Sequence, residues 1–435
     1  MILEFVTKRD NRAIVFSDKG TSVSLSYDGV PIDYFDREGR LVGMFVDDHH
    51  FRRGLDNRLL EKFRIGNGRQ RIRRDVLGSR KCDLVTAVYD RAQQVLDAVR
   101  DGAVSAFTPQ GLGARIDQDG ARANVLERLE TIERWDWDRL VIDGERFRSI
   151  YAPVSILPPD QYLALVVQMT IGCSYNKCTF CDFYRDRPFS IKSTDELRIH
   201  ITRLLEFFGE SAWLRQSLFL LDGNALVIPQ EKLLERLDVI GEFFEFTPVG
   251  ITDPTARARW RREHPHGFDG MYAFLDAFST LKKTVSDWER IRERAVRRVY
   301  LGLESGDDEV LQFIRKPGDR ATMVDAARTI RAAGINVGVI AMIGVGGDRY
   351  AEQHMQNTID AINDMELGEG DIVYLSDFVN HPGLPYERLA AEQKIADLDW
   401  QGLITQRDRI KHGLHFPDPK KPPKIAVYDI REMIY

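Results

Sequence analysis

The stretch 163-LALVVQMTIGCSYNKCTFCDF-183 joins the apolar run LALVVQMT to a polar loop that holds three cysteines. Cys173, Cys178 and Cys181 have the spacing C-x4-C-x2-C, and Cys82 is the only other cysteine in the 435 residues. A short apolar run that ends in a polar loop is typical of a buried strand of a parallel sheet. We therefore expect the cysteine loop to follow the first strand of such a sheet.

Five further apolar runs follow, and helical patterns separate them at about 194–209, 229–244, 284–295, 321–333 and 351–366. The runs are 217-SLFLLDGNALV-227, 270-GMYAFLDAF-278, 297-RRVYLGLESG-306, 335-INVGVIAMIGVGG-347 and 370-GDIVYLSDFV-379. Continuous apolar strands that alternate with amphipathic helices predict a parallel sheet covered by helices, and right-handed crossovers roll six such units into an open barrel. The expected fold class is thus α/β, a partial (β/α)6 barrel of the TIM type, with its chemistry at the C-terminal strand ends.

The part of the chain before this barrel has a different pattern. Residues 1 to about 50 contain short alternating runs such as RAIVF, SVSLSYD and RLVGMFVDD, which predict half-buried antiparallel strands. Helical patterns follow at 82–102 and at about 121–135, and the proline pair in 156-ILPPDQY-162 marks the best boundary. The expected domains are an N-terminal β-rich accessory domain with helices (1–155), the barrel (156–380) and a C-terminal extension (381–435).

Composition limits the class of protein. With 43% hydrophobic and 29% charged residues and a net charge of -6, the chain reads as a globular protein and gives no general case for nucleic-acid binding. No signal peptide or membrane-spanning run is visible, so we expect a cytoplasmic protein without membrane contact, in which clustered thiols bind metal more often than they form disulfides. One segment, 51–81, has eleven Arg or Lys residues against three Asp or Glu. Such a segment can grip RNA or a phosphorylated substrate, or can simply be a solvated face.

Three thiolates on one loop can hold three irons of a [4Fe–4S] cluster and leave the fourth iron without a protein ligand. Zinc needs a fourth protein ligand or a catalytic water, and no nearby Cys or His supplies that ligand. The structural alternative, three inert buried cysteines, fits poorly with the polar residues between them. A plain electron carrier would use four cysteines and need no barrel. Cys82 is expected to be a small buried residue rather than a ligand.

Here the sequence resembles the radical S-adenosylmethionine (SAM) superfamily, over about 160–380. The family's cluster motif is more often C-x3-C-x2-C with an aromatic residue before the last cysteine; Phe180 is that aromatic residue, and the first gap is one residue longer. The stretches GCSYNKCTFCDFYRDRPF, LDGNALV, GLESGDDEVL and GDIVYLSDFV look most like uncharacterised radical SAM proteins near the oxygen-independent coproporphyrinogen oxidases.

The resemblance implies a [4Fe–4S] cluster on the three cysteines and a set of residues for SAM. Asp222, Gly223 and Asn224 stand where the family holds the SAM ammonium. Glu304 and Ser305 stand where it binds the ribose. Lys316, beside Arg315, is in the place of a basic group for the SAM carboxylate. Residues expected near the adenine are Ile340, Tyr374 and Ser376. The structural alternatives are a turn at Asp222, a structural role at Glu304 and solvated charges at Arg315 and Lys316.

The resemblance also implies an enzyme, an oxidoreductase that reductively cleaves SAM and lets the 5'-deoxyadenosyl radical take hydrogen from a substrate. An external electron donor, a reductase, flavodoxin or ferredoxin, is expected. The sequence favours a small-molecule substrate, and His381 and Tyr386 beyond the sixth strand are candidates to touch it. The alternative is an iron–sulfur protein that binds or modifies RNA through 51–81.

Overall fold

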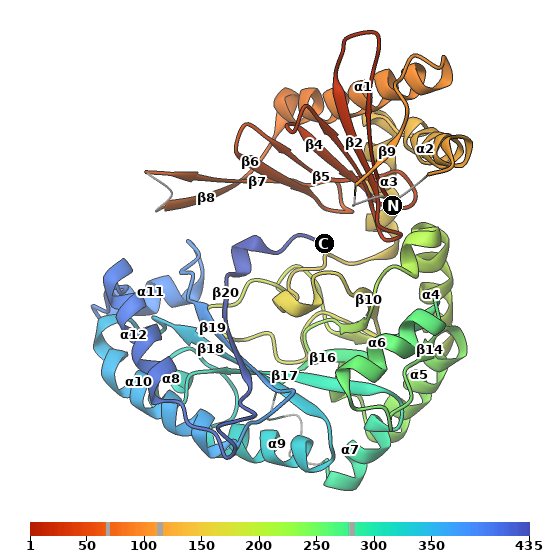
Figure 1. The fold of residues 1–435 in the computed structure, drawn as a ribbon. Coiled ribbons are helices and arrows are strands. Elements are labelled where there is room, and N and C mark those ends of the chain that lie inside the picture. Colours follow the sequence, from red (N-terminus) through yellow and green to blue (C-terminus); the bar gives the residue numbers. More distant parts are fainter. Residues whose placement is uncertain (67–69, 111–115, 277, 279–282) are drawn as a thin grey trace. The chain divides into compact units, whose positions relative to one another are not determined.

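A computed structural model describes residues 1–66, 70–110, 116–276, 278 and 283–435, which fall into two compact units (Figure 1). The first unit consists of Met1–Pro153, Arg203–Leu214 and Ile434–Tyr435, and the second of Val154–Thr202 and Arg215–Met433. No helix among the described residues combines the length and the apolar character needed to cross a bilayer. The domain limits expected from the sequence, 155/156 and 380/381, stay a prediction.

The first unit is built on a nine-stranded antiparallel sheet in the order β8-β7-β6-β5-β4-β3-β2-β1-β9. Along these strands buried apolar residues alternate with more exposed ones; on β1, for example, Leu3 and Phe5 are buried and Glu4 between them is exposed. This pattern confirms the expected β-rich start of the chain. The strands are β1 (Ile2–Val6), β2 (Ala13–Asp18), β3 (Val23–Tyr27), β4 (Ile32–Phe35), β5 (Leu41–Val46), β6 (His49–Arg53), β7 (Leu59–Ile65), β8 (Gln70–Asp75) and β9 (Thr108–Pro109).

Helices pack against this sheet. Both α1 (Gly78–Arg100) and α2 (Gln118–Glu133) contribute buried side chains to the same apolar core as the strands, and their positions confirm the two expected helices. A third helix, α3 (Trp137–Ile150), begins at Asp136, whose side chain accepts a hydrogen bond from the backbone of Arg139. The sequence pattern missed α3, because Gly144 interrupts it.

The basic segment 51–81 lies largely in β6, β7, β8 and the start of α1. Many of its positive charges have partners. Glu61 is fully buried, and its carboxylate accepts hydrogen bonds from Arg74 and Arg80, which holds the pKa of Glu61 at about 2 against the cost of burial. Arg58 pairs with Asp75 across the strands. The charge excess therefore serves in part to hold this ribbon together. Residues 67–69 of the segment lie outside the described part of the chain.

The second unit contains a seven-stranded parallel sheet in the order β10-β13-β16-β17-β18-β19-β20. All six expected strands are confirmed in their expected order. The strands are β10 (Leu165–Gln168), β13 (Leu218–Leu221), β16 (Met271–Leu275), β17 (Val296–Glu304), β18 (Asn336–Ile343), β19 (Ile372–Asp377) and β20 (Lys424–Tyr428). Short pairs are formed by β11 (Thr170–Ile171) with β12 (Ser190–Ile191) and by β14 (Glu245–Phe246) with β15 (Gly267–Phe268).

A seventh strand, β20, adds to the six that the sequence predicts. It comes from the expected C-terminal extension and pairs in parallel with β19, so this part of the extension belongs to the sheet. The strand is short, prolines precede it, and its Val427 is 54% exposed. An edge strand of this kind has only one neighbour and needs little apolar surface.

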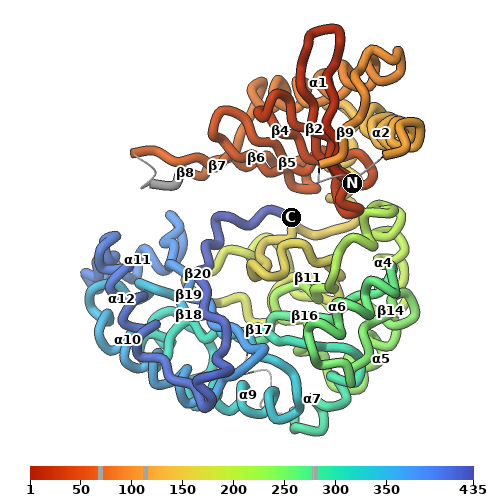
Figure 2. Tube along the Cα trace, in the orientation of Figure 1, coloured from red at the N-terminus to blue at the C-terminus, as the bar shows by residue number. Residues whose placement is uncertain are grey.

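Helices follow each strand before the next begins, and Figures 1 and 2 show α5, α7, α9, α10 and α12 as the outer layer of this unit. The helices are α4 (Thr194–Phe208), α5 (Gln230–Phe243), α6 (Pro254–Glu263), α7 (Val285–Arg292), α8 (Asp308–Phe313), α9 (Arg320–Ala332), α10 (Gly347–Asp364), α11 (Pro385–Glu392) and α12 (Trp400–Gly413), with short 3₁₀ turns η1 (Pro159–Gln161), η2 (Gly209–Ala212), η3 (Ala225–Val227) and η5 (Ile430–Glu432). Strands inside and helices outside make this a partial barrel of the TIM type.

The segment before β10 is tied to the barrel by one carboxylate. Asp160 accepts hydrogen bonds from the hydroxyl of Tyr300 at 2.5 Å, from the hydroxyl of Tyr374 at 2.7 Å and from the guanidinium of Arg298 at 2.8 Å. Tyr428 adds a bond to the carbonyl of Leu157. These contacts join the linker to β17, β19 and β20, which are distant in sequence.

We predict that Asp160→Asn destabilises the second unit by about 2 to 4 kcal/mol, because three donors lose a charged acceptor in a mostly buried place. Urea unfolding followed by circular dichroism measures this loss. Asp195→Asn is the matched control, because Asp195 is 87% exposed and should be near neutral. Equal stability of the two variants would show that the Asp160 contacts are not stabilising.

Candidate active site

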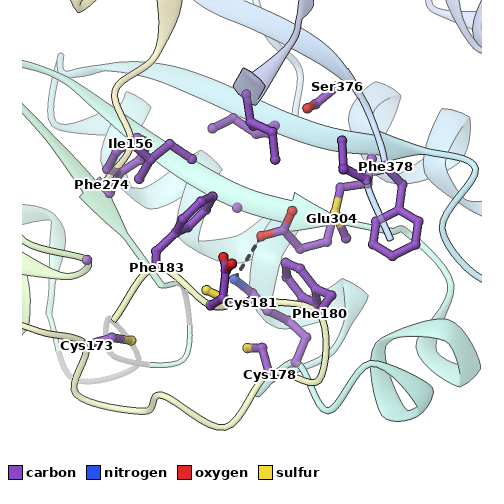
Figure 3. Close-up of a pocket in the computed structure, with 18 of the residues that line it drawn as sticks. Ile156, Cys173, Cys178, Phe180, Cys181, Phe183, Phe274, Glu304, Ser376 and Phe378 are labelled. Carbon is purple, nitrogen blue, oxygen red and sulfur yellow. Dashed lines mark hydrogen bonds and ion pairs between the residues drawn. The ribbon is translucent and has the colours of Figure 1, made fainter. Parts of the chain in front are cut away.

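The cysteine loop begins where β10 ends, at the carboxyl edge of the parallel sheet. Cys173, Cys178 and Cys181 are reduced, partly buried and line one pocket, as Figure 3 shows. The guanidinium of Arg185 donates hydrogen bonds to the carbonyls of Cys181 at 2.6 Å and Cys178 at 2.9 Å. Arg185 therefore stabilises the backbone of the loop, and the three thiols stay free to face the pocket.

Asn176 lies inside the C-x4-C gap and has an unusual backbone conformation. Its φ angle of 51° is in the left-handed region, which asparagine tolerates better than most residues. Its side-chain amide donates to the carbonyl of Tyr184 at 2.8 Å and so bridges the two sides of the loop. The longer gap thus changes the turn and not the number of thiols.

Burial raises the pKa of the Cys173 thiol and raises the pKa values of Cys178 and Cys181 to about 12. Thiols with such pKa values stay protonated at neutral pH when no metal is bound, so a metal must displace their protons. Among the residues that the structure describes, no three Cys, His, Asp or Glu side chains converge on one point as a ready site for a single ion. A four-iron cube differs from a single ion in this respect, because its thiolates sit on separate corners.

A triad of charges faces the thiols across the pocket. The Lys316 ammonium lies 2.8 Å from a carboxylate oxygen of Asp276 and 3.2 Å from one of Glu304. Burial opposes the charge of Lys316, but the two carboxylates outweigh it and hold the pKa of Lys316 well above its usual value. Burial also raises the pKa of Glu304. Two carboxylates share one cation, so the triad keeps one negative charge in excess.

The triad comes from the ends of neighbouring elements. Asp276 directly follows β16, Glu304 is the last residue of β17, and Lys316 follows α8. Glu304 has a φ angle of 58°, which is uncommon for a residue with a side chain and is found most often where function constrains the backbone. Parallel strands bring these ends to the edge that carries the cysteine loop.

Most of the residues that the sequence singles out lie in the wall of this pocket. Besides the three cysteines these are Phe180, Gly223, Glu304, Lys316, Ile340, Ser376 and His381. The structure brings them together from β17, β18 and β19, from the cysteine loop and from the segments after β13, α8 and β19. Their roles toward a cofactor remain proposals.

Asp222 is not among the residues that line the pocket. It is fully buried, and its carboxylate accepts hydrogen bonds from Gln168 at 3.0 Å, from the backbone of Gly172 at 2.8 Å and from Arg187 at 3.2 Å. Burial raises the pKa of Asp222 despite these donors. Asp222 thus holds the residue before Cys173 and lies under the loop rather than in the pocket. Its neighbour Asn224 is likewise fully buried and outside the pocket wall.

Ser305, Tyr374 and Tyr386 are also not among the lining residues, and their hydroxyls have partners within the fold. The Ser305 hydroxyl is fully buried and bonds to a ring nitrogen of His354 at 2.8 Å, so it joins β17 to α10. The Tyr374 hydroxyl donates to Asp160, as described above. The Tyr386 hydroxyl is buried and accepts from the backbone of Gly346 at 3.0 Å. All three hydroxyls bond within the fold, and their partners are distant in sequence.

Several pocket residues were not singled out from the sequence. Asp276 had the same signal as Asp222 and Glu304, an acidic residue right after an apolar strand, and this signal could have found it. Ile156, Phe183 and Ile430 carry no such signal. They reach the pocket only through the path of the linker, the cysteine loop and the segment after β20.

Comparison with known protein families decides the identity. Residues 167–362 match the family model described as the radical SAM superfamily. Residues 167–362 are therefore a radical SAM domain. The chain is an enzyme, and the cofactors of this superfamily are a [4Fe–4S] cluster and SAM. No curated protein matches the chain.

Among solved structures, the radical SAM chain is similar to three enzymes at low identity. They are the cobalamin-dependent SAM radical enzyme OxsB (16% identity, TM-score 0.36, 58% of this chain and 31% of that one), the radical SAM methyltransferase TsrM from Kitasatospora setae, solved with cobalamin and a [4Fe–4S] cluster (14%, 0.37, 56% and 44%), and coproporphyrinogen III oxidase HemN from Escherichia coli (13%, 0.40, 64% and 62%). The chain thus spans about a third of the length of OxsB. These likenesses are too weak to bear on activity.

We predict that Asp222→Asn lowers the stability of this radical SAM protein by about 1.5 to 3 kcal/mol and reduces the iron it retains, because Arg187 loses a charged partner and the loop its anchor. Chemical unfolding of the iron-free protein and iron per chain after reconstitution measure the two effects.

Asp186→Asn is the matched control, since Asp186 pairs with the same arginine but is 55% exposed. Unchanged stability and iron content in Asp222→Asn, together with weaker SAM binding, would support the ammonium role.

Proposed function

We propose that Cys173, Cys178 and Cys181 hold the [4Fe–4S] cluster, and that SAM and the substrate bind in the pocket beside them. The observation that carries this proposal is the meeting of three thiols from one loop with the Asp276–Lys316–Glu304 triad in one pocket. Cys82 is on α1 and is not among the residues that line this pocket, which supports a cluster with three protein ligands.

The pocket residues fit these groups chemically. Three thiols supply three ligands, and no fourth cysteine lines the pocket, so one iron is left for an external ligand. The Lys316 ammonium can pair with a carboxylate, and the excess negative charge of Asp276 and Glu304 can pair with an ammonium or accept from ribose hydroxyls. Ile340 and Met342 of β18 offer an apolar surface for the adenine, with Ser376 of β19 nearby.

When both cofactors are bound, one electron cleaves SAM to methionine and a 5'-deoxyadenosyl radical, which takes a hydrogen atom from the substrate. The protein's part is to bind and orient these partners and to keep water away. Phe180 and Phe183 flank Cys181 in the loop and line the pocket, and Phe378 and Phe274 line it from the strand ends (Figure 3). Aromatic walls of this kind exclude water from a radical.

The electron must come from outside, because the chain has only these three clustered thiols and Cys82. We propose a reductase, flavodoxin or ferredoxin as the donor and the cytoplasm as the compartment.

An RNA substrate is not proposed. It would depend on 51–81, and Arg53, Arg58, Arg74 and Arg80 of this segment make hydrogen bonds within the protein. A small-molecule substrate suits the pocket better, since its walls are mainly apolar.

We predict that the anaerobically reconstituted chain binds about four irons and forms 5'-deoxyadenosine from SAM when dithionite is added, because three thiolates and an open iron suffice for both. The triple variant Cys173→Ala, Cys178→Ala, Cys181→Ala should do neither. Iron analysis, the visible absorption of the cluster and chromatography of the nucleoside measure these results.

Cys82→Ala is the matched control and should behave as the wild type. Loss of the cluster in Cys82→Ala would show that the ligand assignment is wrong.

We also predict that Glu304→Gln and Lys316→Met weaken SAM binding about ten- to a hundredfold, because each loses a charge-assisted contact worth roughly 1.5 to 3 kcal/mol. Equilibrium dialysis with SAM in the absence of reductant measures the affinity, and iron content shows whether the cluster is retained.

Glu309→Gln is the control, because Glu309 is an exposed acid at the second position of α8 and does not line the pocket. If Glu304→Gln loses its cluster and the surviving protein binds SAM normally, Glu304 is structural.

A further inference from the structure

The wall of the pocket beyond the thiols is apolar. Ile156, Phe183, Phe274, Ile340, Val379 and Ile430 line it from the linker, the cysteine loop, β16, β18 and the segments after β19 and β20. The hydroxyl of Tyr300, which also lines the pocket, is already donated to Asp160. This wall therefore offers a substrate apolar contact and few hydrogen bonds.

The charged groups of the pocket are mostly acidic. The lining residues include four carboxylates, on Asp182, Asp276, Glu304 and Asp377, and one cation, on Lys316. Lys316 is engaged by two of these acids. Within the described part of the chain, no side chain hydrogen-bonds or pairs with the carboxylate of Asp182, which lines the pocket and is exposed.

The cofactors do not neutralise this excess. The oxidised cluster core carries two positive charges and its three thiolates carry three negative ones, while SAM carries one net positive charge, so together they add none. The guanidinium of Arg407 lies 3.1 Å from the carboxylate of Asp377 and neutralises its charge. Lys316 neutralises the charge of one further carboxylate. Two negative charges of the pocket are then left for the substrate to meet.

A polar atom of the wall also lacks a partner. The Nε2 atom of His381 is buried and makes no hydrogen bond with the described residues, although His381 lines the pocket. A buried ring nitrogen of this kind costs free energy unless a ligand completes its hydrogen bond. An N–H donor of a substrate completes this bond once the ring turns its Nε2 atom toward the pocket.

We infer that the substrate of this enzyme carries a protonated amine on an apolar or aromatic body. The ammonium group lies near Asp182 and His381, and the body lies against the aromatic and aliphatic wall. A substrate rich in carboxylates or phosphates has no free cation to meet among the lining residues. This inference rests on the proposed function, because the charge balance includes both cofactors.

The test uses three small probes that share a phenyl ring and differ in charge. They are 2-phenylethylamine, 2-phenylethanol and 3-phenylpropanoate. Each is titrated calorimetrically into the reconstituted full chain with SAM and without reductant. We expect the amine to bind at least tenfold more tightly than the carboxylate, because unscreened acids in a partly dry pocket attract one and repel the other.

Asp182→Asn and His381→Leu should each weaken amine binding at least threefold, and Asp182→Asn should leave phenylethanol binding unchanged. Asp186→Asn, an exposed acid four residues along that does not line the pocket, should change neither. Two variants are used because Asp182 adjoins a cluster cysteine and its substitution can affect the cluster.

Equal or tighter binding of the carboxylate overturns the inference, as does amine binding that neither variant weakens or no amine binding at all. Iron content and 5'-deoxyadenosine formation are measured on the same preparations. If both are normal, such a result refutes the amine substrate alone; if no cluster forms, the proposed function fails and the charge balance fails with it.

Discussion

Parallel pairing of seven strands is the constraint on which the site depends. Because β10, β13, β16, β17, β18, β19 and β20 all run in one direction, their carboxyl ends meet at one edge of the barrel. The cysteine loop, Asp276, Glu304 and Ser376 each follow or end one of these strands. Residues separated by two hundred positions in the chain become neighbours in this way, and a change in strand order would separate them.

The same edge sets the electrostatics. Thiols and carboxylates placed in a partly dry pocket lose their hydration, and this raises the pKa values of Cys178, Cys181 and Glu304. Lys316 offsets part of the cost by serving two carboxylates at once. The remaining negative charge suits cationic ligands, of which SAM is one. Burial and charge therefore act together to select what this pocket binds.

Support for the loop lies beneath it. Asp222 receives donors from β10, from the start of the loop and from Arg187, while Arg185 holds the loop from its outer side. A loop that must keep three thiols in place for a cluster cannot rely on its own backbone. The buried carboxylate and the outer guanidinium supply that rigidity, and Asn176 bridges the two sides of the loop.

The sequence by itself determined the order and type of the strands, most helices and the three thiols, because apolar periodicity and cysteine spacing are local properties that one segment carries alone. It also placed Glu304 and Lys316 at the edge where they lie. Only the tertiary structure decided that Asp222 and Ser305 turn into the core while Asp276 faces the pocket, although all three follow apolar strands. The direction of such a side chain depends on hydrogen-bond partners from distant segments. These partners are Gly172 and Arg187 for Asp222, and His354 for Ser305. The weak edge strand β20 is likewise stabilised by its neighbour β19, a contact that no local pattern records.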